Sequence, residues 1–96
     1  MNAIEQGTKH FEECSAKFGT VDYNGETLAI CQQAYPHDDG DAYIASAVSK
    51  KHAIAWEAGE ETSPVSHTVV WMITNPEAEE AEDCCDWSVY SVNEND

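Results

Sequence analysis

The sequence predicts an α+β fold in which one N-terminal helix packs on a mainly antiparallel sheet of four to six strands. Three observations predict it: an opening segment with apolar residues at helical spacing, an Asn-Gly pair between two β-rich segments, and a run of β-branched and aromatic residues near residue 70. A chain of 96 residues has room for one core, so residues 1–96 are expected to form a single domain.

The helix is expected over residues 3–17. Its apolar residues recur at helical intervals: Ile4, Phe11, Cys14 and Phe18. Glu5 lies near the beginning and Lys17 near the end, where each charge interacts favourably with the helix dipole. Gly7 has low helix propensity, so the first turn is expected to fray.

Residues 18–35 are expected to form a β-hairpin. The pair Asn24-Gly25 favours a type I′ turn, because both central residues of that turn need a positive φ. Pro36 is expected to end the second strand, since proline cannot donate to the ladder. Residues 37–41, with the sequence HDDGD, follow as a turn that we name the acidic turn.

Residues 42–56 allow two interpretations. As strands, residues 42–48 would continue the sheet and residues 52–56 would add another strand. As a helix, the segment would have Asp41 as its N-cap and a group of cations towards its C-terminal end. The alanines favour the helix, but the β-rich flanking segments favour the strands, and we expect strands.

Residues 66–75 contain the clearest strand, because positions 68–73 are β-rich and nearly all apolar. Such a run predicts that both of its faces are covered. Polar connections are expected before it, over residues 57–65, and after it, over residues 76–85. Residues 86–92 are expected to form the last strand.

The chain has four cysteines: Cys14, Cys31, Cys84 and Cys85. The N-terminus lacks the basic and apolar stretches of a signal peptide, so we expect reduced thiols in the cytoplasm of a host cell. His10 and Cys14 could share a helix face and bind a metal together with Cys31 and one of the adjacent cysteines. Thiols that act as small core residues are the simpler interpretation, so no metal and no cofactor are expected.

The net charge of the chain is −15, because 19 acidic residues stand against four lysines and no arginine. Direct binding to nucleic acid or to an anionic membrane is therefore excluded as a function, since both need Lys and Arg to neutralise phosphates. No apolar segment approaches the roughly 20 residues that span a bilayer. A basic protein is the partner that such a charge suits.

The acidic residues gather in the expected connections, and residues 65–96 contain eight of them without a basic residue. Six lie in a segment that we name the acidic connector, residues 77–86: Glu77, Glu79, Glu80, Glu82, Asp83 and Asp86. A second cluster lies in the acidic turn: Asp38, Asp39 and Asp41. A third cluster precedes the clearest strand: Glu57, Glu60 and Glu61.

The acidic connector is expected to stay off the core and remain exposed, because burying unpaired carboxylates is prohibitive. A solvated surface that keeps a small protein soluble is the simplest explanation of its charge. The near absence of cations favours a surface that binds in a basic groove of another protein. Trp87 follows the connector and is the expected apolar anchor beside it, although a core position is the commoner one for tryptophan.

In size, charge and clustering of carboxylates, the whole chain resembles the small acidic inhibitors of phages and mobile elements, the nucleic-acid-mimicking anti-CRISPR and anti-restriction proteins. The resemblance implies a stoichiometric inhibitor that is not an enzyme and acts as a monomer or a homodimer. Its partner would be a basic nucleic-acid-binding protein, either a CRISPR surveillance or effector complex or a restriction enzyme. An acidic immunity or antitoxin-like protein that caps a basic nuclease toxin is the alternative.

Overall fold

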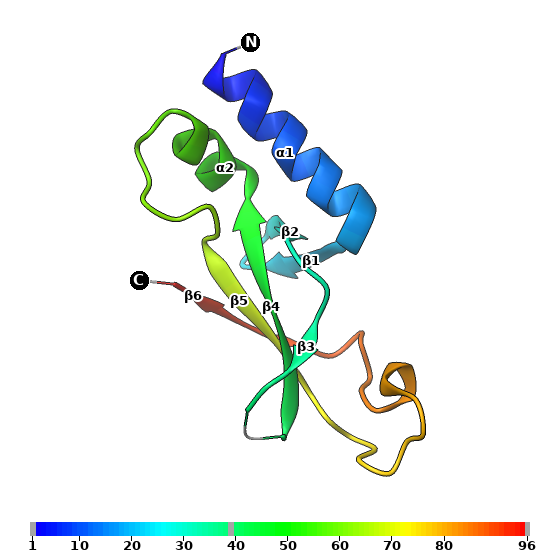
Figure 1. Ribbon diagram of the computed structural model, residues 1–96. Helices are drawn as coiled ribbons and strands as arrows, with labels where there is room; N and C mark the ends of the chain where they lie inside the picture. The colour runs from blue at the N-terminus through cyan, green and yellow to red at the C-terminus, as the bar shows by residue number, and fades with distance from the viewer. Residues whose placement is uncertain (1, 39, 96) are drawn as a thin grey trace.

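The fold is α+β, as the sequence predicts, with an N-terminal helix against a curled antiparallel sheet (Figure 1). The structure is a computed structural model and describes residues 2–38 and 40–95. Helix α1 (Ala3–Phe18) and a second helix, α2 (Lys50–Glu57), lie side by side at one end of the molecule. Six strands form the sheet: β1 (Thr20–Tyr23), β2 (Glu26–Ile30), β3 (Tyr35–Pro36), β4 (Ala42–Ser49), β5 (His67–Met72) and β6 (Ser91–Glu94).

Helix α1 has a defined cap at each end. The Asn2 side chain accepts a hydrogen bond from the Glu5 amide at 2.9 Å, which satisfies one of the unpaired amides of the first turn. At the other end, the Gly19 amide donates to the Ser15 carbonyl at 3.0 Å with φ at +95°, a conformation that favours glycine. The caps explain why the helix begins at Ala3 and ends at Phe18.

The two helices contact each other at Gly7. The first turn of α1 is helical from Ala3 onward, so the expectation that it frays is wrong. Gly7 is the one buried residue of α1, and a Cβ at this position would lie 2.4 Å from the Ile54 Cα of α2. The missing side chain lets the two backbones approach closely, which compensates for the low helix propensity of glycine.

The hairpin turn forms as predicted, with φ of +51° at Asn24 and +80° at Gly25. The second strand is shorter than expected and ends at Ile30. After it, the chain leaves the later part of β4, with which β2 pairs, and reaches the earlier part of the same strand. There Tyr35 and Pro36 form the two-residue strand β3, which pairs with β4 opposite Ile44 and Tyr43. Pro36 therefore lies in a separate short strand and does not end β2.

Residues 42–56 combine both interpretations, a strand followed by a helix. The first part is strand β4, at the centre of the sheet between β2 and β5. Ser49 then becomes the N-cap of α2 by accepting a hydrogen bond from the His52 amide at 3.0 Å. The strand expected over residues 52–56 is therefore wrong, and Lys50 and Lys51 lie at the beginning of the helix.

Strand β5 lies within the predicted segment and pairs antiparallel with β4 and β6. Only one of its faces is buried, which corrects the expectation of two covered faces: Val69 and Trp71 are buried, whereas Met72 is 56% exposed. The last strand also differs from the prediction, since β6 begins at Ser91 instead of residue 86. The structural reason lies in the acidic connector, described below.

The sheet separates two apolar clusters because successive side chains of a strand point to opposite faces. Ala29 and Val48 face the helices and pack with Ala53 of α2. Leu28, Ile30 and their neighbours on β4 and β5 face the concave side, where the cluster also includes Cys84 and Cys85. Within the described residues, neither helix is long and apolar enough to cross a membrane.

Candidate functional site

The backbone of the acidic connector is held against the sheet through its two cysteines. Cys85 forms an isolated antiparallel bridge with Ile73, and the Cys84 carbonyl accepts hydrogen bonds from the amides of Thr74 and Asn75 at 2.9 and 3.0 Å. Both cysteine side chains are buried. The expectation that the connector stays off the core is therefore wrong for its backbone, since the cysteines carry it into the core.

The carboxylates of the connector are nevertheless exposed, as predicted. Every acidic residue of the segment is on the surface: Glu77, Glu79, Glu80, Glu82, Asp83 and Asp86. The short 3-10 helix η1 (Ala81–Asp83) lies in the middle of the segment and precedes the buried cysteines. Two adjacent buried thiols thus anchor a loop whose carboxylates are all exposed, so the loop is held in place without burying charge.

Trp87 fixes the end of the connector and is also partly exposed. Its indole N–H donates to the Glu82 carbonyl at 2.9 Å, and its carbonyl accepts from the indole of Trp71 at 3.2 Å. The ring makes edge contacts with Trp71 and Tyr43 at centroid distances of 5.4 and 5.5 Å. With 38% of its surface exposed, Trp87 both packs on the concave cluster and presents apolar surface beside the carboxylates.

The acidic turn lies beside the start of the connector. The Ile73 amide donates to the Asp41 carbonyl at 3.0 Å, and Ile73 also forms the bridge to Cys85 of the connector, so the two segments come together at the end of the β4–β5 ladder (Figure 1). Asp38 and Asp41 are exposed, while Asp39 lies outside the described residues. The third cluster lies beside and after α2, at the opposite end of the molecule: Glu57, Glu60 and Glu61.

The lysine charges are confined to the two helices. All four lysines lie on α1 and α2, which together carry four glutamates, so the two helices are electrically neutral. Among the described residues a single ion pair forms, between Lys9 and Glu13 at 3.9 Å on exposed side chains of α1. The acidic connector and the acidic turn contain no cation. The densest uncompensated negative charge thus lies at the end of the molecule that carries the acidic connector and the acidic turn.

An apolar hollow beside Asp86 is the part of this surface that the sequence analysis missed. Val70, Met72 and Val89 line it, with a volume of about 170 Å³, and Met72 and Val89 are 56% and 66% exposed. The alternation of β5 could have indicated it, since Val70 and Met72 lie on the face opposite to the buried Val69 and Trp71. Exposed apolar side chains next to carboxylates are typical of a protein interface.

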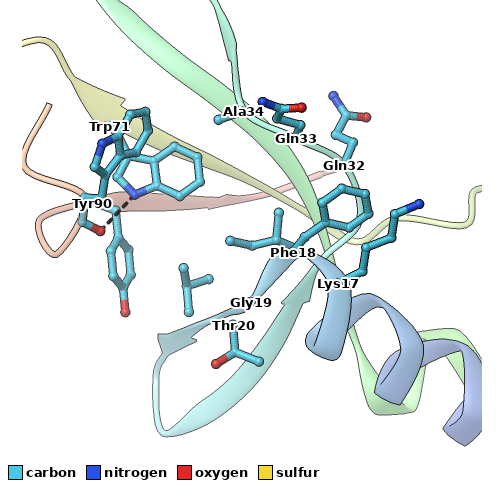
Figure 2. A pocket seen from close by; sticks show the side chains of 12 residues that line it. Lys17, Phe18, Gly19, Thr20, Gln32, Gln33, Ala34, Trp71 and Tyr90 are labelled. Carbon is cyan, nitrogen blue, oxygen red and sulfur yellow. Dashed lines mark hydrogen bonds between the residues drawn. The ribbon is translucent and has the colours of Figure 1, made fainter. Parts of the chain in front are cut away.

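A larger hollow lies on the concave side of the sheet, between the end of α1 and the aromatic residues (Figure 2). It measures about 540 Å³ and is lined mainly by apolar and aromatic side chains, among them Phe18, Trp71, Trp87 and Tyr90. The Lys17 ammonium lies 5.2 Å from the centre of the Phe18 ring, at the same place. Trp87 lines this hollow and also directly follows the acidic connector, so the hollow lies next to the end of the connector.

A local hydrogen-bond pair lowers the pKa of Asp86 below its usual range, because the hydroxyl and the amide of Ser88 both donate to its carboxylate, at 2.6 and 3.1 Å. These bonds favour the ionised form, so their contribution to stability is present above about pH 4 and is lost as the pH falls through the lowered pKa. The same bonds turn the backbone after Asp86, which keeps residues 86–90 out of the last strand.

We expect Ser88→Ala to raise the pKa of Asp86 towards its ordinary value of about 3.9, because it removes the hydroxyl donor. The measurement is an NMR titration of the Asp86 carboxyl carbon in both proteins, with remote carboxyl groups as the internal reference. An unchanged titration of Asp86 would show that the Ser88 hydroxyl does not bind it.

None of the four cysteines, all of which are described, forms a disulfide. The adjacent pair lies in the concave cluster with its sulfurs 3.6 Å apart, and burial raises the pKa of Cys85 to about 11. Cys14 and Cys31 pack against the other cluster, beneath α1. A metal site that combines His10, Cys14 and Cys31 with Cys84 or Cys85 is therefore contradicted, since the sheet separates the two groups.

No protein-family model matches the chain, and no curated protein and no solved structure is significantly similar to it.

Proposed function

We propose that this protein is a stoichiometric inhibitor that binds the nucleic-acid-binding surface of a host defence complex, a CRISPR complex or a restriction enzyme, by imitating the charge of DNA. The observation that carries the proposal is the separation of charge. The exposed carboxylates of the acidic connector and the acidic turn lie together at one end, and neither segment contains a lysine, while the two helices carry all four lysines and are neutral. A surface that served only to repel other molecules would not need this separation.

Carboxylates can replace phosphates in a groove lined by Lys and Arg. The connector folds into turns around the 3-10 helix η1, so its six carboxylates are close together on one exposed loop. Arginine pairs with carboxylate in the same bidentate manner as with phosphate. The anchored backbone of the connector supports the same proposal, because a segment that is already ordered loses less conformational entropy on binding.

The apolar hollow beside Asp86 supports a protein partner. An interface needs apolar contacts that exclude water at its centre, because exposed ion pairs contribute only about 0–1 kcal/mol each. Met72 and Val89 provide such surface next to the Asp86 carboxylate. The partner would place apolar side chains there and its basic groove around the carboxylates.

The proposal is tested by competition with DNA. Labelled duplex DNA is bound to each of a set of purified CRISPR complexes and restriction enzymes, and the protein is added while fluorescence anisotropy is followed. We expect near-equimolar protein to displace the DNA from at least one of them, with an apparent inhibition constant that rises in proportion to the DNA concentration. Direct binding without DNA should weaken steeply between about 50 and 500 mM salt, because screening acts within roughly 10 Å at 0.1 M.

Two results would contradict charge imitation. One is inhibition that does not depend on the DNA concentration, and the other is direct binding that salt leaves unchanged. If the protein instead neutralises only a basic nuclease toxin, the immunity or antitoxin-like alternative is correct.

A further inference from the structure

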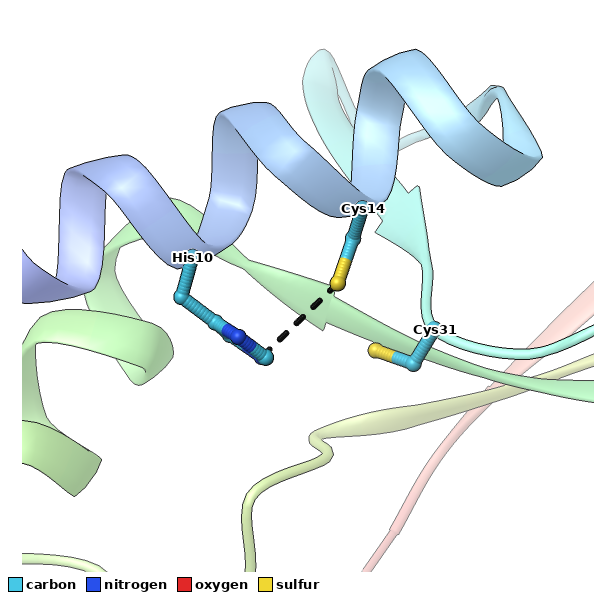
Figure 3. Close-up of side chains that lie close together, drawn as sticks. All are labelled: His10, Cys14 and Cys31. Carbon is cyan, nitrogen blue, oxygen red and sulfur yellow. Dashed lines mark hydrogen bonds between the residues drawn. The ribbon is translucent and has the colours of Figure 1, made fainter.

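His10, Cys14 and Cys31 converge at the junction of α1 with the end of β2 (Figure 3). One ligand atom from each residue lies within 4.8 Å of the other two, and the His10 Nε2 is 3.8 Å from the Cys14 Sγ. In a tetrahedral zinc site neighbouring ligand atoms lie about 3.6–3.8 Å apart, given Zn–N and Zn–S bonds of about 2.0 and 2.3 Å. Small side-chain rotations bring these three residues to that geometry.

The three side chains are carried by backbone that is firmly held. His10 and Cys14 are one turn apart on the same face of α1. Cys31 directly follows β2, and its amide donates to the Ser46 carbonyl of β4 at 2.8 Å. The Ile30 amide donates to the Gly19 carbonyl at 3.0 Å and so ties the end of α1 to β2. A site on such elements is ordered before a ligand arrives.

The surroundings of the cluster suit a soft metal ion that has one coordination position open to solvent. Cys14 and Cys31 pack against Ala29, Val48 and Ala53. His10 also lines a hollow that opens to solvent beside α1. The cluster thus has an apolar side that keeps the sulfurs in place and a solvent side through which an ion and a water molecule can reach it.

We propose that His10, Cys14 and Cys31 form a zinc site with two thiolate ligands, one imidazole ligand and a water molecule in the fourth position. Binding replaces the S–H bond of each cysteine by a Zn–S bond, and the two protons go to solvent. Sulfur and imidazole ligands select zinc over Mg²⁺ and Ca²⁺, which prefer oxygen. The bound ion would fasten α1 to the end of β2. This site does not depend on the proposed function, since it uses none of the residues of the acidic end.

Cobalt reports the site directly, because Co²⁺ bound by thiolates gives a thiolate-to-metal charge-transfer band and strong visible bands when it is tetrahedral. The full chain is reduced, stripped of metal with a chelator and titrated with Co²⁺ in millimolar Mg²⁺, which occupies the carboxylates but not the thiolates. We expect saturation at one equivalent and displacement of the bands by Zn²⁺. Absence of the bands would overturn the proposal.

Single variants assign the ligands. His10→Gln, Cys14→Ser and Cys31→Ser should each weaken zinc binding by more than about a hundredfold, since even outer partners of ligands contribute about 10–100-fold. His37→Gln is the matched control, because His37 is exposed on the acidic turn. Cys84 and Cys85 remain in every variant, so undiminished binding by Cys31→Ser would place the ion elsewhere and refute the assignment.

The site can also be tested on the unmodified protein, which avoids the problem that a variant does not fold. Alkylation of the native protein, mapped by mass spectrometry, should label Cys14 without zinc and spare it with one equivalent of zinc. Equal labelling of Cys14 in the two states would refute the site. A Cys14–Cys31 disulfide in protein purified without oxygen would also refute it, because those sulfurs would not be ligands.

Discussion

Replacing Glu79, Glu80 and Glu82 together by lysine should abolish inhibition while the fold is retained. The three side chains are exposed and take no part in the core, so their removal leaves the packing of the connector intact. In a basic groove, each reversal replaces an attraction by a repulsion, and like charges brought together at an interface cost several kcal/mol. We expect direct binding to weaken by more than about a hundredfold, which corresponds to about 2.7 kcal/mol.

The matched control reverses the cluster beside α2, with Glu57→Lys, Glu60→Lys and Glu61→Lys. Both triple variants have the same net charge, but only the first changes the acidic end. We expect the control to inhibit almost as well as the unmodified protein. Circular dichroism and melting curves of both variants establish that they are folded. Equal inhibition by the two variants would mean that total charge, and not the acidic connector, determines binding.

The second large effect concerns the contact between the helices, where Gly7→Ala should strongly destabilise the fold. Helix propensity alone predicts a gain of about 1 kcal/mol for this change. The new Cβ would, however, lie 2.4 Å from the Ile54 Cα, and backbone cannot move aside as the end of a flexible side chain can. Overpacking of this kind typically costs about 1–3 kcal/mol, and the short distance to backbone places this change at the upper end, so after the gain in propensity we expect a net loss of about 2 kcal/mol.

The loss is measured by urea unfolding, together with a melting temperature that we expect to fall by roughly 10 °C. Gln6→Ala is the control, because Gln6 is the exposed neighbour on the same helix and its replacement should stay within about 0.5 kcal/mol. If Gly7→Ala stabilises the protein, the helices do not approach as closely as described.

The elements that the sequence predicts correctly are those determined by local chemistry. Asn24 and Gly25 accept the positive φ values that the hairpin turn needs, and the apolar stripe of α1 has a helical period whatever lies beneath it. Helix α2 was missed because its eight residues follow a strand without a break, and only the capping hydroxyl of Ser49 marks the boundary. A sequence window of about 11–18 residues covers both the strand and the helix, so its hydrophobic periodicity fits neither of them clearly.

The candidate site was predictable in its composition but not in its arrangement. That the carboxylates of the connector are exposed follows from the cost of burying charge, as expected. The bond from the Ile73 amide to the Asp41 carbonyl joins segments more than thirty residues apart, and no local pattern indicates it. The same is true of Trp87, whose indole bond to Glu82 closes the loop that replaces the beginning of the predicted last strand.

The uneven placement of charge has a consequence for how this molecule approaches another. Because the lysines lie on the helices and the densest carboxylates lie at the far end, charge is distributed unevenly along the long axis of 48 Å, and we expect an electric dipole in that direction. In the field of a basic groove that dipole experiences a torque, so the molecule rotates until its acidic end points towards the groove before the surfaces touch. A larger fraction of encounters then begins in the orientation that leads to binding, which raises the association rate constant.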